Sequence, residues 1–261
     1  MYPKPKKRLG QNFLADKNIR KKIAVSCQLQ KTDIVLEIGA GRGEITNLIA
    51  EHVDTVYAVE FDKDLWQALK DSTQGHQNIK IIKADILKLD LARHFGSLRQ
   101  KIKVIGNVPY YITSPIIAHL LGYRDIIGKI FLTVQKEFAL RICAKPGSKD
   151  YGSFSCFVQY YCLPRVMFSI KNTSFNPAPK VDSSFLSLEI RDQPAVKVKD
   201  EEYFFKVIRS AFNKRRKTLR NSLRETVPSE KLEKFFRNYN INANIRPEDL
   251  ALSDFAHLAN L

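Results

Sequence analysis

The chain has 261 residues, of which 44% are hydrophobic, so it can bury a core and is not expected to be disordered. It has no run of about 18 apolar residues, which excludes a transmembrane helix from the prediction. Lysine and arginine number 43 against 27 acidic residues, a net charge of +16. This surplus favours a polyanionic partner: nucleic acid is expected first, and an anionic membrane surface is the alternative.

Strand-like and helical segments alternate from about residue 20 to residue 145. Strands are predicted where apolar residues alternate or run continuously, and helices where they recur every three or four positions. The predicted strands cover 33–39, 55–61, 79–85, 102–107 and 129–135, and the predicted helices cover 43–52, 63–72, 114–123 and 136–144. The alternation predicts an α/β fold, a doubly wound and mostly parallel sheet with helices on both faces.

Two strand-like stretches without a helix between them follow at 153–162 and 183–190, and we expect them to add an antiparallel edge. A polar segment containing Pro194 begins after residue 191, and the patterns beyond it are short and helical, with one helix expected at 229–239. These patterns predict a first domain over 1–193 and a small all-helical domain over 197–261.

The cysteines and histidines show no metal-binding spacing. Cys27, Cys143, Cys156 and Cys162 form no C-x-x-C pair, and the five histidines are isolated in the sequence. We therefore expect no zinc or other metal site. Free thiols are typical of a reducing compartment, so a cytoplasmic location is expected.

The stretch "EIGAGRGE", residues 37–44, places three glycines between a predicted strand and a predicted helix. Glycines there let the backbone turn sharply and let a ligand approach the N–H groups at the start of the helix. The spacing is G-x-G-x-G, and Glu44 stands where a dinucleotide-binding loop has its last glycine. The loop therefore argues against a pyrophosphate cofactor.

Acidic residues close the next two predicted strands. Glu60 lies 21 residues after Gly39, a place where an acid accepts hydrogen bonds from ribose hydroxyls in doubly wound folds. Asp85 closes the third strand and can accept a hydrogen bond from an adenine amino group. The glycine loop and the two acids therefore frame a nucleoside without a diphosphate. S-adenosylmethionine fits that description better than a dinucleotide.

Asn107 closes the fourth predicted strand, within the segment "NVPYY". Its side-chain carbonyl can accept a hydrogen bond from an exocyclic amine, and so can a backbone carbonyl in the loop that Pro109 stiffens. Tyr110 supplies a flat face on which a base can stack. The geometry suits methylation of a nucleobase amino group, with Asn107, Pro109 and Tyr110 as the predicted catalytic residues and positioning as the main source of catalysis.

The chain resembles the KsgA-type small-subunit rRNA adenine N6,N6-dimethyltransferases along nearly its whole length. The matching segments, in order, are "LGQNFL" (9–14), "LEIGAGRGEIT" (36–46), "NVPYYITSPI" (107–116), "FNPAPKVDSS" (175–184) and "AFNKRRKTLRNSL" (211–223). Val108 replaces the commoner leucine of that family, and Tyr111 stands where the family usually has asparagine.

The resemblance implies a role for several residues. Phe175 would pack on the target adenine opposite Tyr110. The cofactor-binding residues that it implies are Gln11, Asn12, Leu14, Gly39, Gly41, Glu60, Asp85 and Asn107.

Two basic segments, residues 3–8 and 213–224, are expected to contact RNA phosphates, which add affinity but no base readout. The second is predicted to be helical, with Leu219 and Leu223 on an apolar strip. Arg215, Arg216 and Lys217 are its expected substrate-binding cations.

The resemblance implies a monomeric enzyme that uses S-adenosylmethionine to dimethylate two adjacent adenines near the 3′ end of small-subunit rRNA, within an assembling subunit and away from membranes. Two alternatives stay open: a methyltransferase acting on large-subunit rRNA, and a non-catalytic RNA-binding assembly or transcription factor that keeps the fold. A nicotinamide-dependent oxidoreductase is disfavoured by Glu44.

Overall fold

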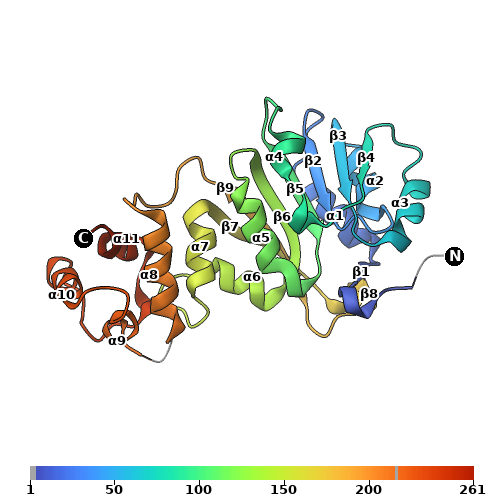
Figure 1. Cartoon of the computed structure of the whole chain (residues 1–261). Helices are drawn as coiled ribbons and strands as arrows, with labels where there is room; N and C mark the ends of the chain where they lie inside the picture. Colours follow the sequence, from blue (N-terminus) through green and yellow to red (C-terminus); the bar gives the residue numbers. More distant parts are fainter. Residues whose placement is uncertain (1–3, 215–216) are drawn as a thin grey trace. The chain divides into compact units, whose positions relative to one another are not determined.

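The computed structural model describes residues 4–214 and 217–261 (Figure 1). The chain divides into two compact units, one formed by Met1–Ala139 with Arg165–Ile190 and the other by Leu140–Pro164 with Arg191–Leu261. This division differs from the expected domains of residues 1–193 and 197–261 in two segments, because residues 140–164 and 191–193 belong with the C-terminal helices.

A seven-stranded sheet with the order β4-β3-β2-β5-β6-β9-β7 forms the centre of the fold, and β1 pairs with β8 in a separate ladder. The strands are β1 (Phe13–Leu14), β2 (Ile34–Ile38), β3 (Thr55–Val59), β4 (Ile79–Ile82), β5 (Ile102–Asn107), β6 (Ile127–Gln135), β7 (Cys162–Ile170), β8 (Phe175–Asn176) and β9 (Ser183–Ile190).

The first five strands of that order run parallel, and β9 pairs antiparallel with β6. The order reverses between β2 and β5, as in a doubly wound fold, which places a crevice at that point. The predicted α/β fold class and the antiparallel strand at 183–190 are therefore confirmed.

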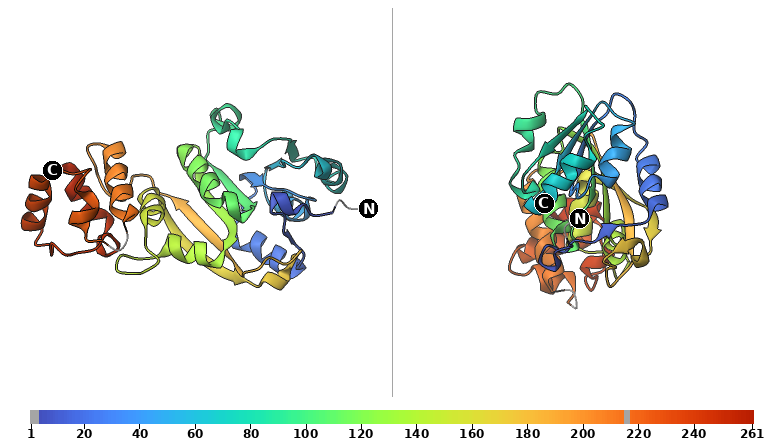
Figure 2. Two further views of the ribbon diagram at one scale, coloured as in Figure 1. Left: turned by 60° about the horizontal axis from the view of Figure 1, so that its bottom comes forward. Right: turned by 90° about the vertical axis from the view of Figure 1, so that its right-hand side faces the viewer.

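Helices cover both faces of the sheet, and Figure 2 shows α1 and α2 on one side and α4 and α5 on the other. On the first side, Ile23 of α1 and Ile49 of α2 are buried against Val35, Ile105 and other sheet residues. The helices of this unit are η1 (Lys7–Leu9), α1 (Lys17–Ser26), α2 (Glu44–Ala50), η2 (Lys63–Leu65), α3 (Trp66–Ser72), η3 (Ile86–Lys88), α4 (Leu91–Phe95), η4 (Tyr110–Ile112), α5 (Thr113–Gly122), the first part of α6 (Lys136–Cys143) and η5 (Asn172–Ser174).

The second unit is helical, and its core contains the buried rings of Phe204, Phe235 and Phe255. Its helices are the second part of α6, α7 (Ser153–Tyr161), α8 (Glu201–Asn213), α9 (Leu219–Leu223), α10 (Ser229–Asn238), η6 (Pro247–Asp249) and α11 (Leu252–Asn260). The helix predicted at 229–239 is confirmed by α10.

The strand predicted at 153–162 was wrong, because residues 153–161 form α7. The stretch is rich in aromatic residues, which favour strands, but packing decides the outcome. Phe154, Phe157 and Tyr161 follow helical spacing, and the ring centroids of Phe154 and Phe157 lie 5.7 Å apart and those of Phe157 and Tyr161 5.5 Å apart. Helical spacing therefore lets these rings pack along one side of the helix.

The continuous helix expected over 213–224 was also wrong, because α8 ends at Asn213 and α9 begins at Leu219. Thr218 is extended and caps α9, its side chain accepting a hydrogen bond from the N–H of Asn221. Leu219 and Leu223 are buried, as the apolar strip predicted. Lys217 is exposed between the two helices, while Arg215 and Arg216 lie outside the described residues.

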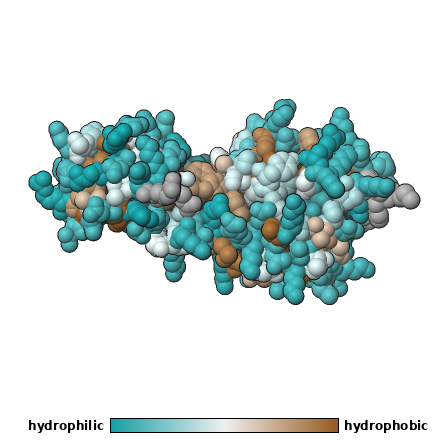
Figure 3. Space-filling view, turned by 90° about the horizontal axis from the view of Figure 1, so that it is seen from below, coloured by the Kyte–Doolittle hydropathy of each residue, from teal (hydrophilic) through white to brown (hydrophobic). Residues whose placement is uncertain are grey.

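On the face drawn in Figure 3, hydrophilic residues cover most of the surface and hydrophobic residues form small, separate groups. Within residues 4–214 and 217–261, no helix has both the length and the apolar character needed to cross a bilayer. Phe61 and Tyr111 are two large aromatic side chains that remain exposed.

Gly43 is expected to resist substitution because it caps α2 with φ 82° and packs closely against α3. A Cβ there would lie 2.5 Å from Ser72 Oγ, which already donates to the carbonyl of Arg42 at 2.6 Å. Gly43→Ala should lower the free energy of unfolding by about 2 kcal/mol or more, measured by urea denaturation.

Gly147→Ala is the matched control, because Gly147 has φ 83° but no described atom lies within 4 Å of its Cβ position. Gly147→Ala should lower the free energy of unfolding by about 1 kcal/mol, which is the cost of the backbone strain alone. An equal loss of unfolding free energy in Gly43→Ala and Gly147→Ala would mean that Ser72 does not crowd a side chain at position 43.

Candidate active site

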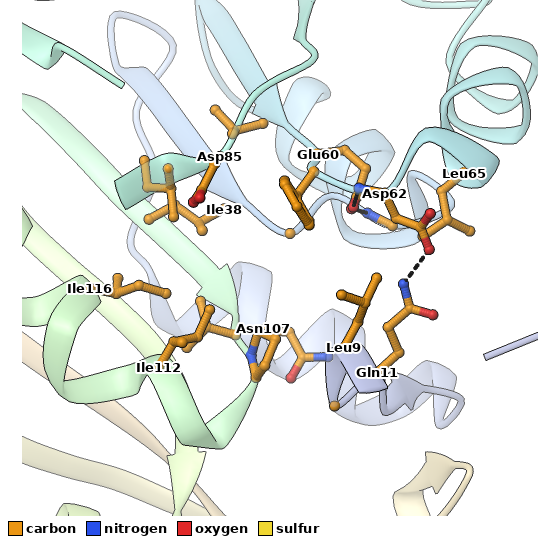
Figure 4. Close-up of a pocket in the computed structure, with 18 of the residues that line it drawn as sticks. Leu9, Gln11, Ile38, Glu60, Asp62, Leu65, Asp85, Asn107, Ile112 and Ile116 are labelled. Carbon is orange, nitrogen blue, oxygen red and sulfur yellow. Dashed lines mark hydrogen bonds between the residues drawn. The ribbon is translucent and has the colours of Figure 1, made fainter. Parts of the chain in front are cut away.

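Neighbouring parallel strands end at one edge of the sheet and bring the predicted polar residues to a single cavity. Figure 4 shows Glu60 and Asp85 on one side of this cavity and Asn107 facing them from the other. The predicted site residues that line it are Gln11, Asn12, Gly39, Gly41, Glu60, Asp85, Asn107, Pro109 and Tyr110.

The glycine loop after β2 passes close to the end of β5 and to the N-terminal segment, by which we mean residues 6–13. Gly39 has φ 75°, and a Cβ on it would lie 3.3 Å from the backbone oxygen of Asn107. Gly41 has φ 61°, and its Cβ would lie 3.3 Å from the ring of Phe13. A side chain at either glycine would therefore crowd this wall of the cavity, and the bare backbone remains open to a ligand.

Glu60 follows β3 and is buried, with both carboxylate oxygens held by backbone donors. The N–H of Gly41 donates to Oε2 at 2.8 Å, and the N–H of Asp62 donates to Oε1 at 2.7 Å. Burial raises the pKa of Glu60, although these two hydrogen bonds oppose the rise. Each oxygen has a further lone pair, so the carboxylate can still accept hydrogen bonds from a ligand hydroxyl.

Asp62 lines the cavity, and the sequence reasoning did not single it out. It is only 5% exposed and accepts hydrogen bonds from Gln11 Nε2 at 2.7 Å and Lys6 Nζ at 2.5 Å. Burial acts to raise the pKa of Asp62, but the hydrogen bonds from Lys6 and Gln11 outweigh burial and hold it below its usual value. Its position two residues after Glu60, beside the same strand end, is the feature of the sequence that could have indicated a place in the cavity.

Gln11 therefore acts on the cavity through Asp62. Its Nε2 donates to that carboxylate, and its Oε1 accepts from the backbone N–H of Lys6 at 2.8 Å. Lys6 also forms an ion pair with Asp64 at 2.7 Å. These contacts of Lys6 and Gln11 hold the N-terminal segment at one end of the cavity. Figure 4 shows Gln11 next to Asp62.

Asp85 follows β4 and caps the short helix η3. Its Oδ1 accepts from the N–H of Leu87 at 3.0 Å, which fixes the carboxylate at the cavity wall. A carboxylate can accept about four hydrogen bonds, so this cap leaves capacity for a ligand amino group. Ile86 and Leu87 add apolar surface beside it.

The side chain of Asn107 is oriented by the N-terminal segment. Its Nδ2 donates to the backbone oxygen of Asn12 at 3.0 Å, so Oδ1 is the acceptor end of the amide. Asn12 therefore orients Asn107 through its main-chain oxygen and not through its side chain. Pro109 follows two residues later and precedes the short helix η4.

Tyr110 begins η4, and its ring is half-buried in the cavity wall. Its hydroxyl shares a hydrogen bond of 2.6 Å with Ser183 Oγ at the start of β9. Burial raises the pKa of Tyr110, so the phenol stays neutral and does not serve as a base at ordinary pH. The bond to Ser183 holds the plane of the ring.

Two predicted residues, Leu14 and Phe175, do not line the cavity. They pair with each other in the β1–β8 ladder and are 3% and 4% exposed, within the core cluster that contains Ile23 and Ile49. The expectation that Phe175 forms an aromatic platform opposite Tyr110 is therefore not met in this structure, because strand pairing turns its ring into the core. The same "FNPAPKVDSS" segment supplies Ser183 instead.

Within residues 4–214 and 217–261, no cluster of histidine, cysteine and acidic side chains could hold a metal ion. What the cavity offers is a set of fixed acceptors, Glu60, Asp85 and the Oδ1 of Asn107, beside an aromatic ring and apolar walls. Such a set can hold a nucleoside and orient an amine, but it includes no strong base.

Comparison with known proteins identifies the family and relatives of this chain. The profile of the family described as "Ribosomal RNA adenine dimethylase" matches residues 3–261. Proteins named "Ribosomal RNA small subunit methyltransferase A" are similar: one from Streptococcus thermophilus is 43% identical over 98% of this chain and 91% of its own length. One from Moorella thermoacetica is 40% identical over the same shares.

Two solved structures share the fold. A dimethyladenosine transferase from Plasmodium falciparum superposes with a TM-score of 0.80, at 24% identity, over 94% of this chain and 95% of that one. The 23S rRNA methyltransferase ErmE has a TM-score of 0.75, at 24% identity, over 95% and 98%.

A buried carboxyl group on β2 is expected to make stability depend on pH. Burial raises the pKa of Glu37 to about 8 from its ordinary 4.5, and nearby Glu60 adds to the rise. Between these two values the unfolded chain has released the proton that the folded chain still holds, so the free energy of unfolding falls as pH rises. Glu37→Gln should remove this contribution, worth about 1 kcal/mol per pH unit, in urea titrations from pH 5 to pH 8.

Glu51→Gln is the matched control, because Glu51 is an exposed acid at the end of α2. It should retain the pH dependence of the wild type. A Glu37→Gln variant whose stability follows that of the wild type at every pH would show that Glu37 ionises as an exposed acid does.

Proposed function

Since this chain belongs to the ribosomal RNA adenine dimethylase family, we propose that it uses S-adenosylmethionine to dimethylate N6 of two adjacent adenines near the 3′ end of small-subunit rRNA during subunit assembly. The observation that carries the proposal is the orientation of Asn107 beside Tyr110. Its Nδ2 is bound to Asn12, so its Oδ1 is the acceptor available at the edge where Glu60 and Asp85 also lie.

The residues of the cavity fit S-adenosylmethionine. Glu60 would accept hydrogen bonds from the ribose hydroxyls, Asp85 from the adenine amino group, and Gly39 and Gly41 would let the amino-acid part approach the backbone. When bound, this cofactor supplies an electrophilic methyl group on a sulfonium. The buried Glu60 and Asp62 add acceptors and negative charge on the same side of the cavity.

The chain's own part in the reaction is to hold the target amine. Asn107 Oδ1 and a backbone carbonyl near Val108 would accept its two N–H bonds, which turns the nitrogen lone pair towards the methyl group. Tyr110, with its hydroxyl held by Ser183, would stack on the adenine. Since Tyr110 stays neutral, the proton would leave to water after the methyl transfer.

The RNA would be held by phosphate contacts, consistent with the net charge of +16. We assign these contacts to the basic N-terminal segment and to the region of Arg215, Arg216 and the exposed Lys217. The target adenines must leave their stack to enter the cavity, at a cost of a few kcal/mol. The protein would act in the cytoplasm, as a monomer, on the assembling subunit.

Two alternative functions are a methyltransferase acting on large-subunit rRNA and a non-catalytic assembly factor. The likeness to the 23S rRNA methyltransferase ErmE is one of fold, at 24% identity, whereas the relatives at 40–43% identity have a small-subunit name. This difference favours the small subunit as substrate. A non-catalytic assembly factor would need neither an oriented Asn107 nor a tethered Tyr110, so the intact geometry favours an enzyme.

The direct test is transfer of labelled methyl from S-adenosylmethionine to small ribosomal subunits that lack the modification, with large subunits and naked RNA in parallel. We expect N6,N6-dimethyladenosine, identified by nucleoside analysis, on the small subunit only. Label on the large subunit would favour the alternative substrate, and binding without transfer would favour the assembly factor.

Asn107→Ala should lower kcat at least about a hundredfold at saturating cofactor, because the acceptor that orients the amine is lost. Binding of the small subunit, measured by sedimentation, should be retained because the phosphate contacts are untouched. Asn244→Ala removes an exposed asparagine of the second unit and serves as the control. Near-normal turnover by Asn107→Ala would contradict the role proposed for this amide.

A further inference from the structure

Tyr111 presents an exposed aromatic ring at the rim of the cavity. Its side chain is 64% exposed, and it lines the same cavity as Asn107 and Tyr110. A single exposed aromatic residue is ordinary on a protein surface, so exposure alone means little. The position of Tyr111, next in sequence to the ring that would stack on the target base, is what suggests a use.

One edge of the Tyr111 ring lies close to the N-terminal segment. A Cβ on Gly10 would lie 3.2 Å from Tyr111 Cε1 and 3.3 Å from Tyr111 Cδ1, so one edge of the ring rests against Gly10. Gly10 has φ 61° and ends the short helix η1, a conformation that suits glycine. The ring therefore has the backbone at Gly10 along one edge, while most of its surface faces solvent.

Tyr110 and Tyr111 cannot serve the same base. Consecutive residues of a 3₁₀ helix point about 120° apart, and both tyrosines lie in η4. Tyr110 is half-buried and bonded to Ser183, whereas Tyr111 is exposed at the rim of the same cavity. A base that stacks on Tyr111 would thus be a neighbour of the one inserted beside Tyr110.

The residues around Tyr111 suit a nucleotide. Lys7 and Arg8, both exposed, form η1 with Leu9 directly before Gly10. Exposed cations beside a flat aromatic ring are the combination that binds the phosphate and the base of a single strand. We propose that Tyr111 stacks on the base next to the target adenine and so holds the RNA strand while the target is inserted. This inference rests on the proposed function.

The test compares Tyr111→Phe, Tyr111→Leu and Tyr111→Asn in methyl transfer to small subunits that lack the modification. Tyr111→Leu keeps an apolar side chain without a stacking face, and Tyr111→Phe keeps the face without the hydroxyl. We expect the leucine and asparagine variants to raise the KM for subunits about tenfold, with kcat little changed, and the phenylalanine variant to stay within about twofold of the wild type.

The affinity for S-adenosylhomocysteine, measured by calorimetry, should be the same in all variants, and so should the midpoint of thermal unfolding. A KM for Tyr111→Leu within twofold of the wild type would overturn the proposal. So would a loss of cofactor affinity equal to the rise in KM, because the ring would then serve the cofactor.

Sedimentation of the same variants with small subunits, without turnover, measures binding separately. A wild type that transfers no methyl would overturn the proposed function, while the stacking role would still be supported by about tenfold weaker subunit binding in Tyr111→Leu than in Tyr111→Phe. Equal subunit binding by Tyr111→Leu and Tyr111→Phe would overturn the stacking role.

Discussion

The parallel pairing of β2 with its two neighbours is the constraint on which the site depends. Ile38, the last residue of β2, pairs with Val59 of β3 on one side and with Gly106 of β5 on the other. Because the strands share direction and register, the residues that follow them emerge at one level of one edge. Glu60 and Asn107, 47 positions apart in the sequence, therefore face a common cavity.

The N-terminal segment completes the cavity from the other side, through polar contacts with two strand ends. Gln11 and Lys6 hold the buried Asp62, and the backbone of Asn12 orients the amide of Asn107. Without these donors, Asp62 would be a buried charge that lacks its partners, which is costly. The segment thus stabilises the carboxylates and sets the direction in which Asn107 accepts a hydrogen bond.

The "FNPAPKVDSS" segment has two structural roles, one in the core and one beside the cavity. Its first residue, Phe175, pairs with β1 and fills the core, while Ser183 in the same segment binds the hydroxyl of Tyr110. The ring beside the target is therefore positioned by a strand that lies two places away from β5 in the sheet. A substitution in this segment can change the site without any residue of it lining the cavity.

The sequence by itself determined the doubly wound fold, because apolar periodicity and glycine spacing are local, and it located Glu60, Asp85 and Asn107 at strand ends. It could not show that Asp62 is a buried partner of Lys6 and Gln11, since that contact joins segments 51 to 56 residues apart. It also placed residues 153–162 in a strand, where packing of aromatic rings favours α7. Only the tertiary structure decided which aromatic rings reach the cavity, because burial of Phe175 and exposure of Tyr111 follow from long-range packing and not from residue type.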